Sequence, residues 1–124
     1  MDQEVLRRIR DLKDRSIAEL RSYSNPGKKT VQVLKAVAIL FKVDTADWDW
    51  IKAKLMIKDS RAFKQKMIEF EVDSVSDRTV NLLQRFESSD LNAPGSTRNI
   101  SEAVHAMWCW VAAVATKCGL EITA

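Results

Sequence analysis

The residue types that most often carry catalysis or bind metals are rare in this chain. The single histidine, His105, lies in an apolar segment, and the sequence suggests no partner for it at the spacing of a metal site or a catalytic triad. Two cysteines, Cys109 and Cys118, stand nine residues apart, which suits neither a CxxC redox pair nor paired metal ligands. We therefore expect a structural role for His105 and reduced thiols at both cysteines.

Two further patterns could bind ions or phosphate, and both are weak. Glu69, Glu71 and Asp73 alternate along a short acidic run, and alternation just before a helix is more typical of a solvated linker than of a cation site. The three glycines are scattered at 27, 95 and 119, so no glycine-rich loop can cradle a phosphate. The sequence therefore predicts a non-catalytic protein that needs neither a metal nor a cofactor.

Positive charge gathers in one part of the chain. From Lys28 to Lys66 ten basic residues stand against four acidic ones, whereas from Met67 to Gly95 six acidic residues stand against two basic ones. Because a positive field favours association with a polyanion, the candidate partners are nucleic acid, anionic lipid or an acidic protein. The alternative is that lysine-rich helices serve only solubility.

The best candidate for a binding surface is the helix that follows Asn25-Pro26-Gly27. Pro26 disfavours helix at the residue before it and suits the first turn of a new helix. Up to about Val43, apolar residues recur on one wide face of this segment. The opposite side carries a polar stripe made of Lys28, Gln32, Lys35 and Lys42. The pattern predicts an amphipathic helix with one buried face and one basic exposed face.

The elements that position this helix are also helical. The 124 residues contain only three glycines and two prolines, which favours an all-α domain over a turn-rich β fold. With 46% hydrophobic residues, the chain can bury a core without disulfides or metals. Capping patterns predict that further helices begin at Thr45 or Asp47, at Asp59 or Ser60, at Ser74 and at Asn99.

Both ends of the chain carry narrow apolar seams. Val5, Ile9 and Leu12 have the four-then-three spacing of a coiled coil, and Ile17 and Leu20 continue it one residue out of phase. The last predicted helix repeats this spacing at Met107, Val111, Val114 and Cys118. The two ends could therefore pair as an antiparallel coiled coil that bears a globular tip. The alternative for residues 1–24 is a fraying terminal helix.

The aromatic residues narrow the choice of partner. Trp108 and Trp110 share their helix with apolar residues and are expected in the core. Trp48 and Trp50 point to opposite sides, so at least one is expected to be partly exposed. Basic residues do not alternate with exposed aromatics as single-strand nucleic-acid binding requires, and the longest apolar stretch is too short for a bilayer. We therefore expect neither a nucleic acid nor a membrane as partner.

Taken in order, these residues resemble the microtubule-binding domain at the tip of the dynein heavy-chain stalk. The stretch from Ile17 to Pro26 is similar to the end of the first stalk coil and the turn after it. The apolar residues from Val31 to Leu40 fall where the first domain helix has its own. The similarity continues through Asp47-Trp48 with Ile51, Phe63 to Phe70, and Ile100 to Val111. Gly27 stands where the family usually has a second proline, and Lys35 where an acidic residue is common.

The resemblance implies a compact globule of about six helices flanked by an antiparallel two-helix stalk coiled coil. Residues 1–24 would be the end of the first stalk coil, residues 25–109 the globule, and residues 110–124 the start of the second coil. The implied function is non-catalytic microtubule binding for a motor whose ATPase ring lies outside this chain, with affinity set by the register of the stalk coils. The implied location is the cytoplasmic cytoskeleton, in particular the axoneme of a cilium or flagellum.

The resemblance and the basic pattern together predict the residues that contact α/β-tubulin. These are Lys28, Lys29, Gln32 and Lys35 on the first helix, Lys58 and Arg61 on the next basic segment, and Arg98 from the last helix. The alternative is a helical scaffold at the stalk tip that binds a protein partner. A leucine-rich-repeat dynein light chain would be such a partner, held through exposed Trp48 or Trp50.

Overall fold

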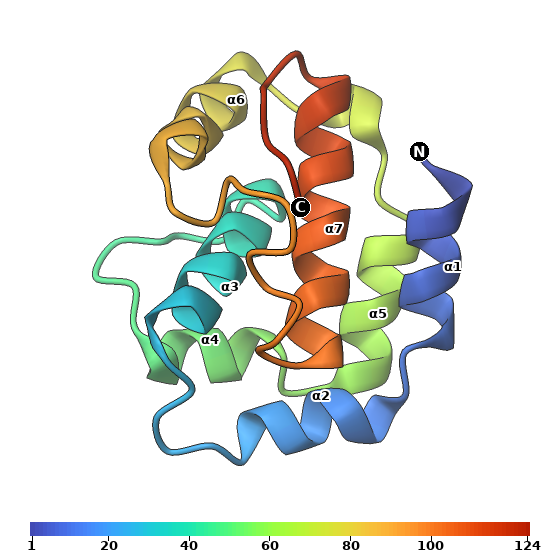
Figure 1. The fold of residues 1–124 in the computed structure, drawn as a ribbon, viewed down its shortest axis with the longest axis vertical. Helices are drawn as coiled ribbons and strands as arrows, with labels where there is room; N and C mark the ends of the chain where they lie inside the picture. Colours follow the sequence, from blue (N-terminus) through green and yellow to red (C-terminus); the bar gives the residue numbers. More distant parts are fainter.

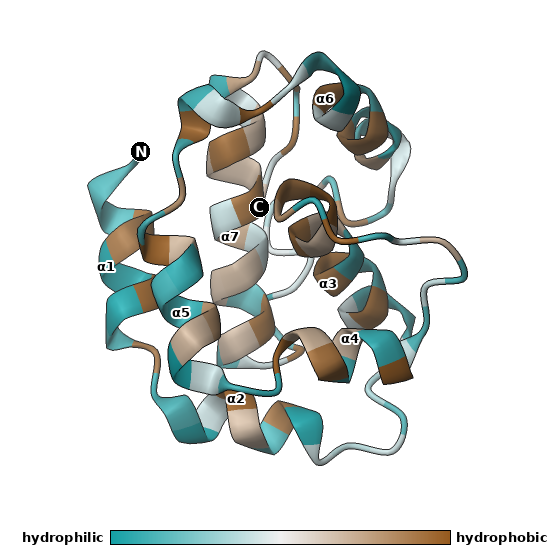
Figure 2. Cartoon of the chain, turned by 180° about the vertical axis from the view of Figure 1, so that it is seen from behind, coloured by the Kyte–Doolittle hydropathy of each residue, from teal (hydrophilic) through white to brown (hydrophobic).

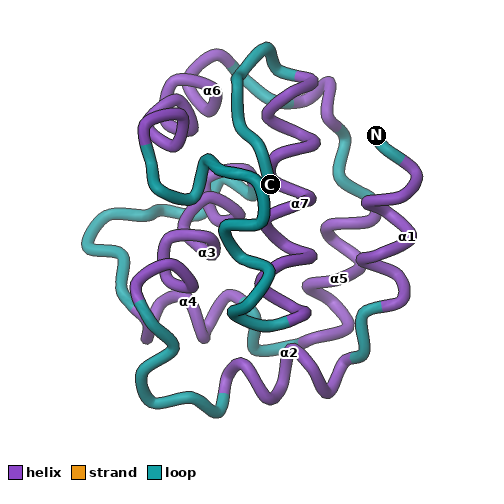
Figure 3. Tube along the Cα trace, viewed as in Figure 1, coloured by secondary structure: helices purple, strands orange, loops and turns teal.

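Seven α-helices and two short 3₁₀ helices make up the fold, and no strand is present (Figures 1 and 3). The computed structural model describes all 124 residues. The elements are α1 (Gln3–Asp11), α2 (Asp14–Arg21), α3 (Lys28–Leu40), α4 (Trp50–Met56), α5 (Ser60–Ile68), η1 (Val72–Ser74), α6 (Asp77–Leu83), η2 (Gln84–Ser88) and α7 (Glu102–Lys117). The prediction of an all-α globule is confirmed.

The longest helix, α7, lies at the centre of the molecule. It packs against α3 on one side and against α1 on the other, with α5 beside α1 (Figures 1 and 2). Trp108 and Trp110 are fully buried, as predicted, and their indole N–H groups donate to the carbonyls of Leu91 and Met67, each at 3.1 Å. A buried indole nitrogen without an acceptor would cost stability, so these two bonds fix the segments that close over α7.

The second buried helix is α3. Its apolar residues from Val33 to Leu40 are inaccessible or nearly so, whereas Lys28 at its start is exposed. The sequence predicted that this helix extends to about Val43, but α3 ends at Leu40. Lys42 adopts a φ of 60°, and the N–H of Val43 bonds the carbonyl of Ala38 at 2.9 Å, which closes the helix with a left-handed turn.

Residues 1–24 contain two separate helices, α1 and α2. The chain leaves the helical conformation at Leu12 and Lys13, where the apolar seam also slips out of phase. The Lys64 ammonium from α5 donates to the carbonyls of Leu12 and Arg10, so the end of α1 is satisfied from outside the helix. Arg21 of α2 then donates to the carbonyl of Ile57 at 2.7 Å. Both helices are thereby held against the globule.

The other chain end also packs on the globule. α7 continues without a break across residue 110 and ends at Lys117. Residues 118–124 then return along α7, where Leu120 and Ile122 are buried (Figure 1). The Asn92 side chain fixes this return, because it donates to the carbonyl of Glu121 at 2.8 Å and accepts from the N–H of Thr123 at 2.7 Å. The two-helix stalk coiled coil expected at the chain ends is therefore not present in the structure of these residues.

Side chains in the loops decide where the shorter helices begin. Asp59 caps α5 as predicted, through the N–H of Ala62. The other three predicted starts are wrong, since α4, α6 and α7 are capped by Asp49, Ser76 and Ser101. Two of the residues that were predicted as caps take part in turns instead. Asp47 adopts a φ of 52°, and the Ser74 hydroxyl donates to the carbonyl of Glu71 within η1.

Candidate functional site

The first turn of α3 is the basic surface that the sequence singled out. It begins after Gly27, whose φ of 93° is open mainly to glycine, so no side chain stands at the capping position. No side chain elsewhere caps the helix, and its first turn contains no acidic residue. Lys28 and Lys29 instead add positive charge to the positive end of the helix dipole, an arrangement that costs a few tenths of a kcal/mol each, up to about 1.

A shallow pocket lies at this helix start. It is lined by Pro26, Gly27, Lys28, Lys29, Thr30, Gln32, Asp90 and Ile100. The last two residues come from the loop between η2 and α7, which the fold brings to α3. Thr30 is only 1% exposed, and its hydroxyl oxygen has no hydrogen-bond partner. The Asp90 carboxylate accepts only from the neighbouring Ser89 hydroxyl, at 3.4 Å, and so does not cap α3.

The structure places the seven predicted contact residues in three groups. Lys28, Lys29 and Gln32 share the pocket at the start of α3, and Lys35 lies farther along the same helix, partly exposed. Lys58 and Arg61 line a separate open hollow between α4 and α5. Arg98 is exposed in the loop before α7. None of the six cations among them forms an ion pair, because the three salt bridges of the protein involve only Arg7 and Lys64 as cations.

The three groups share one end of the molecule. In Figure 1 the first turns of α3, α5 and α7 all lie toward the end where α2 crosses, and Figure 2 shows the same end from behind. The positive ends of three helix dipoles therefore lie near the unpaired cations. Asp59 and Ser101 cap α5 and α7, so α3 is the one of the three whose first N–H groups receive no side-chain acceptor. This end of the molecule is the most favourable place for an acidic partner.

Trp48 and Trp50 are both partly exposed, which agrees with the prediction that at least one would be. Their indole N–H groups are already used, since Trp48 donates to the carbonyl of Val31 at 3.0 Å and Trp50 to that of Tyr23 at 2.8 Å. The freely accessible apolar side chains beside them are Ile51 and Leu55, which are 66% and 65% exposed. Because they stand four residues apart, they lie on one face of α4. We call this pair the α4 ridge.

His105 and Cys109 form a small cluster that was not predicted from the sequence, although residues four apart on one helix share a face. His105 Nε2 lies 3.6 Å from Cys109 Sγ, and His105 Nδ1 lies 2.9 Å from the Thr97 hydroxyl. Burial lowers the pKa of His105, and the positive charges of Arg8 and Arg98 lower it further. Burial raises the pKa of the Cys109 thiol. Both shifts favour the neutral forms, which suits packing better than nucleophilic attack.

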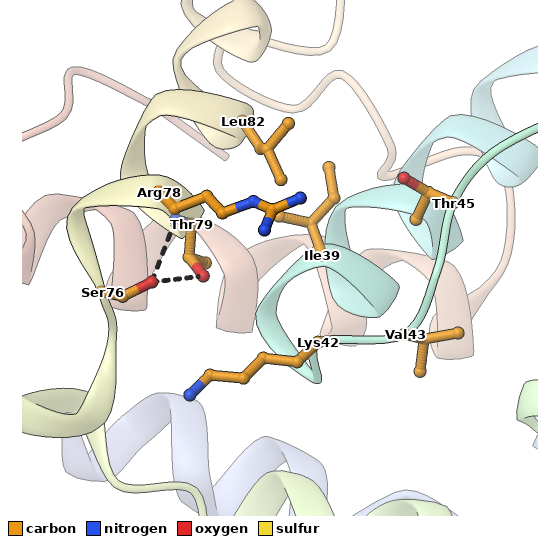
Figure 4. Close-up of a pocket in the computed structure, with 8 residues that line it drawn as sticks. All are labelled: Ile39, Lys42, Val43, Thr45, Ser76, Arg78, Thr79 and Leu82. Atoms are coloured by element: carbon orange, nitrogen blue, oxygen red, sulfur yellow. Dashed lines mark hydrogen bonds between the residues drawn. The ribbon is translucent and has the colours of Figure 1, made fainter.

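A second polar hollow lies between the end of α3 and the start of α6 (Figure 4). Lys42 and Arg78 contribute its charges, but their side chains point in different directions in Figure 4. The Ser76 hydroxyl is engaged with Thr79, at 3.1 Å from its hydroxyl and 3.2 Å from its N–H. The hollow therefore offers no converging set of free groups. No three His, Cys, Asp or Glu side chains come together as a metal site anywhere in the protein.

Comparison with known proteins adds no relative from which a role could be taken. No protein-family model matches the chain, and no curated protein sequence is significantly similar to it. None of the helices combines the length and the apolar character needed to cross a membrane. The fold and the site thus describe a helical module with an uncapped basic helix start at one end and an exposed apolar ridge nearby.

Three residues of the site were not foreseen as site residues from the sequence. Nothing in the sequence indicated that the hydroxyl of Thr30 would be buried and unpaired. Asp90 and Ile100 reach the pocket from a loop about 60 residues away along the chain, so only the fold brings them there. The missing cap was detectable, because glycine precedes two lysines where Ser, Thr, Asp or Asn would normally stand.

Proposed function

We propose that this chain is a non-catalytic module that binds the acidic surface of a microtubule, as the tip of a dynein stalk. The observation that carries the proposal is the first turn of α3, where Lys28 is exposed, Lys29 is partly exposed and neither lysine forms an ion pair. Lys28, Lys29, Gln32 and Lys35 are the primary contacts, supported by Lys58, Arg61 and Arg98. The resemblance of the sequence to the dynein stalk tip supplies tubulin as the acidic partner.

Affinity in this proposal comes from many weak contacts. Exposed ion pairs contribute about 0.2–1 kcal/mol each, so several must act together for micromolar binding. Such pairs are screened by salt, and binding should weaken steeply as ionic strength rises. Cations without internal partners break no ion pair when they bind tubulin carboxylates, which favours this end over the paired Arg7 and Lys64.

The test is co-sedimentation with microtubules across a salt series. The double variant Lys28→Glu/Lys35→Glu should weaken binding by roughly 30-fold or more, since two attractive contacts become repulsive. The matched control, Arg10→Glu/Arg85→Glu, makes the same change of net charge at exposed residues outside the proposed contact set and should bind nearly as well as the unaltered protein. Helicity should be unchanged in both. Equal binding by the two variants would reject this assignment of the surface.

The stalk belongs to the same proposal. Its coils would be joined to the two chain ends, which pack on the globule, and the packing of α1 against α7 offers a contact through which a change of coil register could act. The experiment is to attach both coils and cross-link them in each of two registers. Different microtubule affinities in the two registers are expected. Equal affinities would remove register control from the proposal.

A second candidate function is a scaffold that holds a protein partner, and the α4 ridge favours it. Side chains as exposed as Ile51 and Leu55, with Tyr23 at 50% nearby, are commonly found where another protein docks. Lys52 and Lys54 stand between them along α4, so the surface mixes apolar and basic side chains (Figure 2). The probe is a purified leucine-rich-repeat dynein light chain. Salt-tolerant binding that is lost in Ile51→Ser/Leu55→Ser would identify this function; no binding would exclude the light chain.

A further inference from the structure

We propose that the pocket at the start of α3 is a carboxylate-binding site that receives one acidic side chain of the protein partner. This inference rests on the proposed function, which supplies tubulin as the protein that carries the acidic side chain. It differs from a set of surface ion pairs, since the anion would be held by backbone N–H groups and by a buried hydroxyl as well as by lysines.

The backbone at the start of α3 has unused donors. The first N–H groups of a helix have no acceptor within the helix, and here no side chain supplies one. Gly27 keeps the approach open, since a Cβ placed on it would meet no atom within 4 Å. Such a helix start attracts anions through its N–H groups and its dipole together. Lys28 and Lys29 stand in the same turn, where they oppose the dipole in the free protein but would attract an incoming carboxylate.

The Thr30 hydroxyl is an independent sign of a ligand. A buried hydroxyl without a partner loses its hydration and gains nothing in return, which is why such groups are rare in folded proteins. Thr30 lines the pocket, and its hydroxyl is the one buried side-chain polar atom of the protein that lacks a partner. A carboxylate oxygen at this position would accept from the hydroxyl and from the N–H groups of the first turn.

Charge favours a singly charged anion. The pocket contains the two lysines and one acid, Asp90, so its nearest side chains sum to about one positive charge. A carboxylate neutralises this charge, whereas a doubly charged phosphate would leave the pocket with a net negative charge. In the free protein Asp90 partly screens the lysines. It is therefore an internal competitor of the incoming acid.

The first experiment uses acetate as the carboxylate probe, with sodium chloride and inorganic phosphate at equal ionic strength. Acetate should shift the amide resonances of residues 27–32 in the unaltered protein and should leave them nearly unmoved in Thr30→Val. Thr116→Val removes an exposed hydroxyl at the other end of α7 and should respond like the unaltered protein. No local shift, or equal shifts in Thr30→Val, overturns the proposal. Shifts with phosphate but not with acetate overturn the assignment to a carboxylate.

The second experiment measures microtubule affinity. Thr30→Val should bind about tenfold more weakly, the loss expected for a hydrogen bond to a charged group, and Thr116→Val should be unchanged. Asp90→Asn should bind about threefold more tightly, whereas the matched control Asp73→Asn, on the exposed η1 turn, should have little effect. If microtubules bind but Thr30→Val and Asp90→Asn leave affinity unchanged, the inference is overturned and the proposed function stands. If acetate binds but microtubules do not, the proposed function fails and the carboxylate site stands.

Discussion

Replacing Thr30 with valine should make the free protein more stable. The Thr30 hydroxyl is buried and unpaired, and an unsatisfied polar group of this kind costs about 1–3 kcal/mol. Valine has nearly the same shape, so the exchange removes the hydroxyl without opening a cavity. It also adds a buried methyl group, whose transfer from water is favourable by about 0.8 kcal/mol. Helix propensity changes little, because both residues are β-branched.

We therefore expect Thr30→Val to raise the free energy of unfolding by roughly 2–4 kcal/mol, which for a domain of this size is a rise in melting temperature of roughly 8–15 °C. Urea denaturation followed by the fluorescence of the four tryptophans measures it. The midpoint should move to higher urea with the slope unchanged, since the buried surface is the same.

The control is Thr79→Val, because Thr79 is also buried but its hydroxyl lies 3.1 Å from the Ser76 hydroxyl. Removing a bonded hydroxyl should lower the free energy of unfolding by about 1 kcal/mol. A destabilised Thr30→Val protein would refute the reasoning, since it would mean that the Thr30 hydroxyl has a stabilising partner. A stabilised variant that binds microtubules less well would show that the unpaired hydroxyl is retained for binding.

Three further predictions concern the core and the cluster on α7. Burial and the charges of Arg8 and Arg98 lower the pKa of His105, so protonation of His105 disfavours the folded state. The free energy of unfolding should therefore be highest at pH values above about 6.5, the pKa of histidine in the unfolded chain, and should decline as the pH falls below it. Denaturation midpoints measured at several pH values should show this decline, and His105→Asn should reduce it; an equal decline in both proteins would rule out His105 as its source. Cys109 and Cys118 have pKa values raised by partial burial and should react with iodoacetamide more slowly in the folded than in the unfolded protein at the same pH. Equal rates would contradict the partial burial of the thiols. Trp110→Phe loses the bond to the Met67 carbonyl and should lower the free energy of unfolding by about 1–3 kcal/mol, clearly more than Trp48→Phe at a partly exposed position; equal losses would mean that this buried bond is not important.

The sequence by itself determined the helical class of the protein and much of its core. Low glycine and proline content and apolar residues at helical spacing are local properties, so the predicted helix after Asn25-Pro26-Gly27 and the burial of Trp108 and Trp110 both agree with the structure. The basic side of α3 also follows from spacing, because residues three and four apart share a face of a helix. The uneven distribution of basic and acidic residues along the chain is likewise a property of the sequence alone.

The limits of local patterns appear at the helix ends. Several polar residues in each loop could serve as caps, and sequence spacing does not say which one the chain uses. Asp47 and Ser74 lost this role to Asp49 and Ser76 because turns in the loops placed them in other conformations. The out-of-phase seam in residues 1–24 indicated a slip between Leu12 and Asn25, but it did not indicate that the helix would break at Leu12, whose carbonyl accepts from Lys64 of α5.

Only the tertiary structure decided the details of the binding site. Asp90 and Ile100 enter the pocket because the fold brings the long loop before α7 to α3. The indole N–H of Trp108 fixes that loop by bonding the Leu91 carbonyl, one residue beyond Asp90. The unpaired state of the Thr30 hydroxyl is likewise a property of its surroundings and not of its place in the sequence. Local spacing therefore determined which side of α3 is basic, and long-range packing determined that its first turn is an open pocket with unused donors.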